Sequence, residues 1–116
     1  MRDELRTWEA AGFKLVTWDT RKRDWRGQTR IGYTLSDNGV EVFSGSDFSG
    51  SPMHADDADE TVAALLSFLS LKPGDTDREY FDNYTPEQMA WVESGRAEEL
   101  GYLAMELEEG ARADRE

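Results

Sequence analysis

The 116-residue sequence contains no cysteine and only one histidine. The absence of cysteine excludes disulfide bonds, thiolate zinc sites and cysteine nucleophiles. Long hydrophobic runs are also missing, since none approaches the roughly 20 residues that a membrane-spanning helix needs. The polar N-terminal stretch MRDELRTWEAAG does not resemble a signal peptide. We therefore expect a cytoplasmic protein that makes no contact with a membrane.

Lysine is rare as well, because the chain has ten arginines and three lysines, a bias typical of a high-GC bacterial or phage genome. Hydrophobic residues make up 38% and aromatic residues 11% of the chain, which predicts a folded protein although 33% is charged. At this length we expect one small domain over residues 1–116, with an ordered core over 1–109 and a charged tail over 110–116.

The net charge of −12 is distributed unevenly along the chain. Residues 1–45 carry eight basic and seven acidic side chains, a net charge of +1, whereas residues 46–116 carry five and eighteen, a net charge of −13. Such an asymmetry can steer association with a charged partner, and it also keeps a small protein soluble.

The N-terminal segment Asp3 to Ala11 is predicted to be a short helix. Leu5 and Trp8 are spaced i, i+3, and Gly12 follows as a stop signal. Residues 13–20 and 28–36 are predicted to be strands, because apolar and β-branched side chains alternate in both. Residues 21–27 between them are predicted to be a loop.

The pair Asn38-Gly39 is typical of a two-residue type I′ hairpin turn, since both positions tolerate positive φ. This turn would place Asp37 opposite Val40 and Leu35 opposite Val42. Ile31, Tyr33, Leu35, Val40 and Val42 would then share one apolar face. Residues 44–55 are rich in glycine and serine and are predicted to connect this sheet to a helix.

A central helix is predicted from Asp59 to Leu71, because bulky apolar side chains would form one face of it. These side chains are Val62, Leu65, Leu66 and Leu69. Ala63, Ser67 and Ser70 form a narrow strip of small side chains that would face solvent or a closely packed neighbour. The spacing of Asp57 and Glu60 resembles a capping box at the start of this helix.

A second long helix is predicted from Pro86 to about Glu108, with a possible kink at Gly95. It begins at Thr85, which is followed by Pro86 and by Gln88 three positions on. Together these elements predict an α+β fold in the order α-β-β-β-α-α, with a three-stranded antiparallel β-meander packed against helices.

The sequence offers one weak candidate for a metal site, at His54, Asp56 and Asp57. An imidazole beside carboxylates could ligate a divalent cation and serve a metal-dependent enzyme. Acidic residues ahead of a helix are explained more simply by the helix dipole. No phosphate-binding glycine loop or serine nucleophile motif is present, so we expect no cofactor and a protein that is not an enzyme.

Two charged segments are candidate binding surfaces. The first is the arginine-rich segment 21–30, where Arg21, Arg23 and Arg26 surround Trp25, a combination suited to phosphate contacts and base stacking. It could instead contact the acidic half of the protein or of a second copy, as in a homodimer. Because the chain as a whole is acidic, direct binding of nucleic acid is the less favoured alternative.

The second surface is the acidic C-terminal helix, with its candidate residues Glu98, Glu99, Glu106 and Glu108. A solvated helix face is the ordinary explanation for such residues. They could also imitate nucleic-acid phosphates and occupy a basic groove on a nucleic-acid-handling protein. The sequence therefore favours a small acidic interaction module, an accessory or inhibitory protein of bacterial or phage origin.

Overall fold

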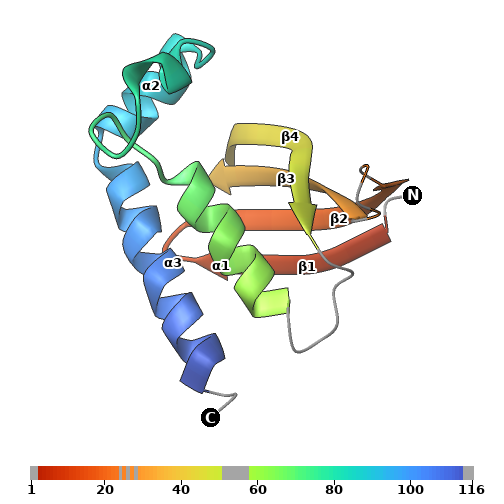
Figure 1. The fold of residues 1–116 in the computed structure, drawn as a ribbon. Helices are drawn as coiled ribbons and strands as arrows, with labels where there is room; N and C mark the ends of the chain where they lie inside the picture. The colour runs from red at the N-terminus through yellow and green to blue at the C-terminus, as the bar shows by residue number, and fades with distance from the viewer. Residues whose placement is uncertain (1–2, 24, 26, 28, 51–57, 114–116) are drawn as a thin grey trace. The chain divides into compact units, whose positions relative to one another are not determined.

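The computed structural model describes residues 3–23, 25, 27, 29–50 and 58–113. The chain divides into two compact units, Met1–Val62 and Ala63–Glu116. The elements in chain order are β1 (Asp3–Ala10), β2 (Phe13–Arg23), β3 (Thr29–Asp37), β4 (Val40–Gly50), α1 (Ala58–Leu69), the 3₁₀ helix η1 (Arg78–Phe81), α2 (Pro86–Glu93) and α3 (Arg96–Ala113) (Figure 1). The α+β class is confirmed. That residues 1–116 form a single domain stays a prediction.

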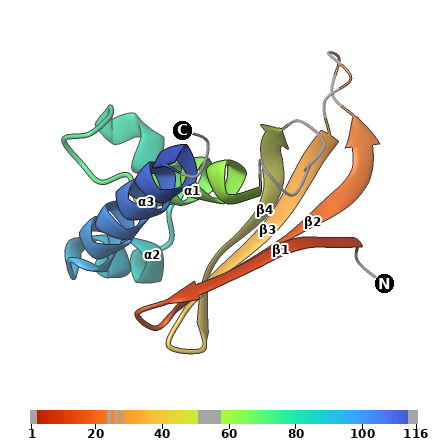
Figure 2. The ribbon, with the colours of Figure 1, turned by 90° about the horizontal axis from the view of Figure 1, so that it is seen from below.

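The first unit contains a four-stranded antiparallel sheet in the order β1-β2-β3-β4, which Figure 2 shows to be twisted. The predicted three-stranded meander and the predicted N-terminal helix are therefore wrong, because residues 3–10 form the edge strand β1. Ala11 and Gly12 have φ values of 51° and 90° and make a two-residue turn from β1 to β2. Gly12 thus serves a hairpin and does not end a helix.

A β-bulge explains why β1 looks helical in the sequence. Glu4 pairs with Trp18 and Arg6 with Thr17, so that Leu5 is an extra residue on β1. The extra residue interrupts the strict alternation, and Leu5 and Trp8 are both half-buried although they lie three positions apart. The hydroxyl of the buried Thr17 stabilises the bulge, accepting from the Arg6 amide at 3.2 Å and donating to the Arg6 carbonyl at 2.9 Å.

One face of the sheet carries the buried residues of the first unit. The pairings Leu15–Leu35 and Thr17–Tyr33 place these side chains on the same side of β2 and β3. The buried residues of this face are Phe13, Leu15, Thr17, Ile31, Tyr33, Leu35 and Phe43. Residues 13–20 are confirmed as a strand.

The hairpin at Asn38-Gly39 is confirmed, with φ values of 52° and 85°, and Asp37 faces Val40 as predicted. Leu35 pairs with Phe43 and not with Val42, because the register shifts between Leu35 and Ser36 and leaves Val42 as an extra residue on β4. Phe43 is buried in consequence, whereas Val40 is 68% exposed.

Two segments predicted to be loops belong to strands. β2 continues through Arg23, which pairs with Thr29, so the connection to β3 is shorter than the predicted loop over 21–27. β4 continues to Gly50 and bends sharply along its length (Figure 1), so it takes in much of the segment predicted to connect sheet and helix. Glycine is a poor loop signal in this segment because Gly45 pairs with Tyr33 within the sheet and lies against its ring.

Gly32 and Gly45 are the two glycines covered by aromatic side chains. Gly32 pairs with Trp18, and a Cβ atom at this position would collide with the Trp18 indole. Gly45 pairs with Tyr33, and a Cβ atom there would lie 2.9 Å from the Tyr33 hydroxyl oxygen. Each ring thus shields the strand backbone where its glycine partner has no side chain.

The second unit is helical. Its buried side chains are Ala63, Leu65, Leu66, Leu69, Phe81, Val92, Ala97, Leu100 and Ala104. α1 ends at Leu69, two residues before the predicted end, and the predicted capping residue Asp57 lies outside the described residues. Rings of Phe68, Tyr80, Phe81 and Tyr84 contact one another at centroid distances of 5.0 to 6.0 Å and hold η1 to the end of α1. The predicted packing of this helix on the sheet stays a prediction.

The predicted C-terminal helix is divided into α2 and α3 at Ser94-Gly95, where Gly95 has a φ of 92°. Its predicted start is confirmed: Thr85 accepts from the Gln88 amide at 3.1 Å, and the Gln88 side chain accepts from the Thr85 amide at 2.9 Å. α3 runs to Ala113, past the predicted end, so the start of the predicted tail 110–116 is helical.

Within the described ranges, no helix combines the length and apolar character that a bilayer crossing requires.

Replacing Ala11 with glycine should stabilise the protein. Ala11 has a positive φ, which costs a side-chain-bearing residue about 1 kcal/mol and costs glycine little. We expect Ala11→Gly to raise the free energy of unfolding by up to about 1 kcal/mol in urea denaturation. A loss of about 1 kcal/mol would instead indicate that Ala11 lies inside a helix.

Replacing Gly32 with alanine should destabilise the protein by about 1 to 3 kcal/mol, because the new methyl group displaces the Trp18 indole. The measurement is urea denaturation of Gly32→Ala in the natural and in a Trp18→Thr background. The cost should fall markedly when Trp18 is absent. An equal cost in both backgrounds would contradict the stacking of Trp18 on Gly32.

Candidate functional site

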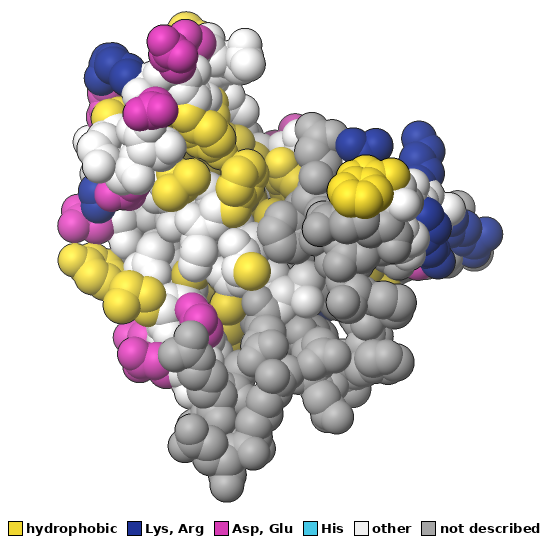
Figure 3. Space-filling view, in the orientation of Figure 1, with side chains coloured by type: hydrophobic (Ala, Val, Ile, Leu, Met, Phe, Trp, Pro, Cys, Tyr) yellow, Lys and Arg dark blue, Asp and Glu magenta, His cyan; other side chains and the backbone are white. Residues whose placement is uncertain are grey.

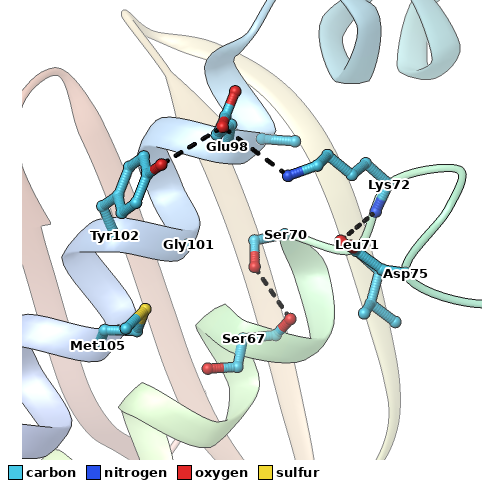
Figure 4. A pocket seen from close by; sticks show the side chains of 10 residues that line it. Ser67, Ser70, Leu71, Lys72, Asp75, Glu98, Gly101, Tyr102 and Met105 are labelled. Atoms are coloured by element: carbon cyan, nitrogen blue, oxygen red, sulfur yellow. Dashed lines mark hydrogen bonds and ion pairs between the residues drawn. The ribbon is translucent and has the colours of Figure 1, made fainter.

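A groove lies in the second unit, where the end of α1 and the loop that follows it face α3 (Figure 4). Its volume is about 280 Å³, just below the range of about 300 to 1,000 Å³ typical of small-molecule sites. The lining residues are Ser67, Ser70, Leu71, Lys72, Asp75, Ala97, Glu98, Gly101, Tyr102 and Met105. A groove of this size suits one large side chain of a partner.

The groove exists because small residues let the two helices approach. A Cβ atom on Gly101 would lie 3.3 Å from Ser70 Oγ and 3.6 Å from Ser70 Cβ. Ala97, one turn before Gly101 on α3, is completely buried. Ser70, which belongs to the predicted strip of small side chains, therefore packs closely against α3. Ser67, in the same strip, is exposed.

The rim of the groove is polar and carries both signs of charge. Glu98 Oε1 lies 4.0 Å from Lys72 Nζ and accepts a hydrogen bond from the Tyr102 hydroxyl at 3.4 Å. Asp75 Oδ2 accepts from the Lys72 amide at 3.2 Å and fixes the loop after α1. Figure 4 shows Glu98 at the centre of this network, between Lys72 and Tyr102. Tyr102 is thereby held beside the groove.

The side chains that line the groove can bind a ligand. Among these described residues, none is arranged as a nucleophile with a neighbouring base. The Ser70 hydroxyl donates to the Ser67 carbonyl at 3.0 Å and so closes the last turn of α1. The sequence has no cysteine, and its single histidine, His54, lies outside the described residues. What the lining can do is accept hydrogen bonds, attract a cation and contact an apolar side chain.

One face of α3 continues from the groove, and we name it the α3 stripe. Tyr102 and Met105 on this face are 60% and 56% exposed, and their i, i+3 spacing places them side by side. Glu98, Glu106 and Glu109 flank them at helical spacing and are exposed as well. The α3 stripe consists of Glu98, Tyr102, Met105, Glu106 and Glu109.

The predicted acidic residues do not act as one group. Glu98 and Glu106 belong to the α3 stripe, and Glu99 lies beside it in an ion pair with Arg96 at 2.6 Å. Glu108 is half-buried and lies on the side of α3 that includes Gly101 and Ala104, away from the stripe. Acidic side chains are spread over the helices of the second unit in Figure 3.

The acidic residues near the two ends of α3 differ in what they do for folding. Glu98 and Glu99 lie in the first turn, where the helix dipole favours negative charge. Glu109 lies close to the other end, where the dipole disfavours negative charge, and Glu106 lies in the middle of the helix, where the dipole has little effect. The dipole thus favours Glu98 and Glu99 and does not favour Glu106 or Glu109.

The basic candidate surface is the far end of the β2–β3 hairpin, and we name it the hairpin tip. It consists of the described residues Arg21, Lys22, Arg23, Trp25 and Arg30, all exposed, with Trp25 90% exposed. The predicted residues Arg21, Arg23 and Trp25 are therefore brought together, whereas Arg26 lies outside the described residues. Basic side chains gather at this end of the sheet in Figure 3.

The predicted weak metal ligands His54, Asp56 and Asp57 also lie outside the described residues. In the part of the chain that the structure describes, no group of three or more His, Cys, Asp or Glu side chains could hold a metal ion.

Sequence reasoning missed Tyr102 and Met105. Leu100, Leu103 and Leu107 recur at helical spacing and predict the core stripe of this helix, and Leu100 is completely buried. Tyr102 and Met105 do not fit that stripe, and large apolar residues outside the core stripe are the signal that could have identified them.

Neutralising Glu109 should leave stability unchanged or raise it by up to about 0.5 kcal/mol, because a carboxylate near the end of a helix is unfavourable. Neutralising Glu98 should lower stability by about 0.5 to 1 kcal/mol, because it removes a charge from the first turn and the contacts with Lys72 and Tyr102. Urea denaturation of Glu109→Gln and Glu98→Gln measures both changes. Equal losses in the two variants would contradict the different roles assigned to them.

In comparisons with protein-family models, curated proteins and solved structures, nothing matched this chain.

Proposed function

We propose that this protein is a non-catalytic interaction module that binds a basic partner protein through the α3 stripe and the adjoining groove. The observation that carries the proposal is the exposure of Tyr102 and Met105, 60% and 56%, between carboxylates on one helix face. Tyrosine and methionine are enriched in the centres of protein interfaces, where polar residues form the rim. The α3 stripe has this composition.

The charge of the stripe indicates the chemistry of the partner. Three carboxylates border two apolar side chains, and the helix dipole stabilises neither Glu106 nor Glu109. Positive side chains on a partner would offset the repulsion between these carboxylates. The net charge of −12 would raise the rate of encounter with such a partner.

The partner that fits this chemistry best is a basic nucleic-acid-handling protein. Its phosphate-binding groove presents arginine and lysine side chains that the stripe carboxylates could meet in place of phosphates. The module would then act as an accessory or inhibitory protein, in keeping with its small size and its acidic helices. A partner apolar side chain would enter the groove beside Tyr102.

The proposal is tested by selecting binders from a library of random peptides on the immobilised protein. We expect the natural protein to enrich peptides that combine arginine or lysine with one large apolar residue. Tyr102→Ser with Met105→Ser, and separately Glu106→Gln with Glu109→Gln, should each abolish that enrichment, because they remove the apolar centre or the charged rim.

The chain offers matched controls for both pairs. Val40→Ser removes an apolar side chain that is 68% exposed on β4, and Glu87→Gln with Glu93→Gln removes two exposed carboxylates from α2. Both controls should enrich the same peptides as the natural protein. The proposal fails if the natural protein enriches no basic peptides, or if the α3 variants still enrich the same set.

A further inference from the structure

The hairpin tip is a second surface, and it has the features of a ligand for the α3 stripe. Trp25 is 90% exposed, although a tryptophan side chain gains more than any other from burial. Four exposed cationic residues, Arg21, Lys22, Arg23 and Arg30, lie near it in the same hairpin. The aromatic ring and the cations of the hairpin tip complement the two apolar side chains and the carboxylates of the α3 stripe.

The strand residues that lead into this tip have a defined backbone. Asp19 pairs with Ile31 and Arg23 with Thr29, so β2 has extra residues where β3 has only Arg30. Arg21 takes a φ of 63°, and its amide donates to Asp19 Oδ1 at 2.6 Å. The Thr20 hydroxyl donates to the Arg30 carbonyl at 2.7 Å across the two strands. These bonds fix the backbone that carries Arg21 and Arg30.

We propose that the hairpin tip of one copy binds the α3 stripe of a second copy, so that the chain pairs with itself. This inference rests on the proposed function, because the same stripe receives the partner. Trp25 would contact Tyr102 and Met105, a ring contact and a sulfur–aromatic contact. The arginines of the tip would meet the glutamates of the stripe.

The composition of the α3 stripe favours a second copy over a nucleic acid as the occupant. A second copy carries the same net charge of −12, so long-range repulsion does not distinguish the two occupants, and salt screens it beyond a Debye length of about 8 Å at physiological ionic strength. The stripe offers carboxylates to the cations of the tip, and it offers two exposed apolar side chains, Tyr102 and Met105, to the Trp25 ring.

The pairing has a symmetric form. If each copy gives its tip to the stripe of the other, two equal contacts form about a two-fold axis, and association stops at the dimer. One hairpin end and one helix face bury little area, so the dimer should be weak, with a dissociation constant between about 10 μM and 1 mM. Self-pairing at high concentration would then cover the stripe and compete with a basic partner.

Sedimentation equilibrium of the full chain over a range of concentrations tests the inference. We expect a monomer–dimer equilibrium in the natural protein. Trp25→Ser should weaken it about tenfold or more, and Arg21→Glu with Arg23→Glu should do the same. Glu106→Arg with Glu109→Arg should also weaken it, and this pair should fold because both side chains are exposed and the helix dipole favours a cation at position 109.

Mixing the two charge-reversed variants is the decisive step. The acidic tip of one variant then meets the basic stripe of the other, so the mixture should dimerise although each variant alone does not. Glu87→Arg with Glu93→Arg on α2 is the matched control and should dimerise like the natural protein. A monomeric natural protein at about 1 mM, or a mixture that stays monomeric, overturns the inference.

The outcomes separate this inference from the proposed function. If the natural protein stays monomeric and still selects basic peptides through the α3 stripe, self-pairing is wrong and the proposed function stands. If it dimerises and selects no basic peptides, the stripe serves only self-pairing. Salt-dependent binding of a labelled single-stranded oligonucleotide that Trp25→Ser abolishes, in a natural protein that stays monomeric, would assign the tip to nucleic acid and overturn the inference.

Discussion

The close approach of α1 and α3 at Ser70 and Gly101 is the constraint on which the candidate site depends. Because Gly101 has no side chain, α3 lies against Ser70, and a Cβ atom at position 101 would lie 3.3 Å from Ser70 Oγ. Tyr102 follows Gly101 directly and so lies at the edge of the contact, where its hydroxyl donates to Glu98. A larger residue at position 101 would have to displace Ser70, which lines the groove beside it.

The acidity of α3 has two origins that the sequence alone does not separate. Glu98 and Glu99 stabilise the start of the helix through the dipole and through ion pairs with Lys72 and Arg96. Glu106 lies beyond this influence, close to two exposed apolar side chains. Glutamate thus stabilises the fold at the start of α3 and forms part of the proposed binding face along the rest of the helix. The proposed function depends on the second group.

The sequence predicts the elements whose signals are local. The hairpin at Asn38-Gly39 and the helix start at Thr85 depend on a few adjacent residues with particular φ values and hydrogen bonds, and both are confirmed. The strand β1 was missed because a bulge disturbs its alternation and because Ala11 does not indicate a positive φ. Of the candidate site on α3, the sequence predicts only the acidic residues. Tyr102 and Met105 were missed although both lie outside the helical spacing of the core residue Leu100, because the extent of their exposure depends on how α3 packs.

The central claim is that the α3 stripe is a binding surface for basic, aromatic-containing ligands. Its most direct test is a titration of the isotope-labelled protein with a short peptide of alternating arginine and tryptophan, followed by amide chemical shifts. The account predicts concentration-dependent shifts that are confined to residues 67–75 and 97–109 and that Met105→Ser reduces. Shifts centred on another surface, or no shifts at about millimolar peptide, would contradict it.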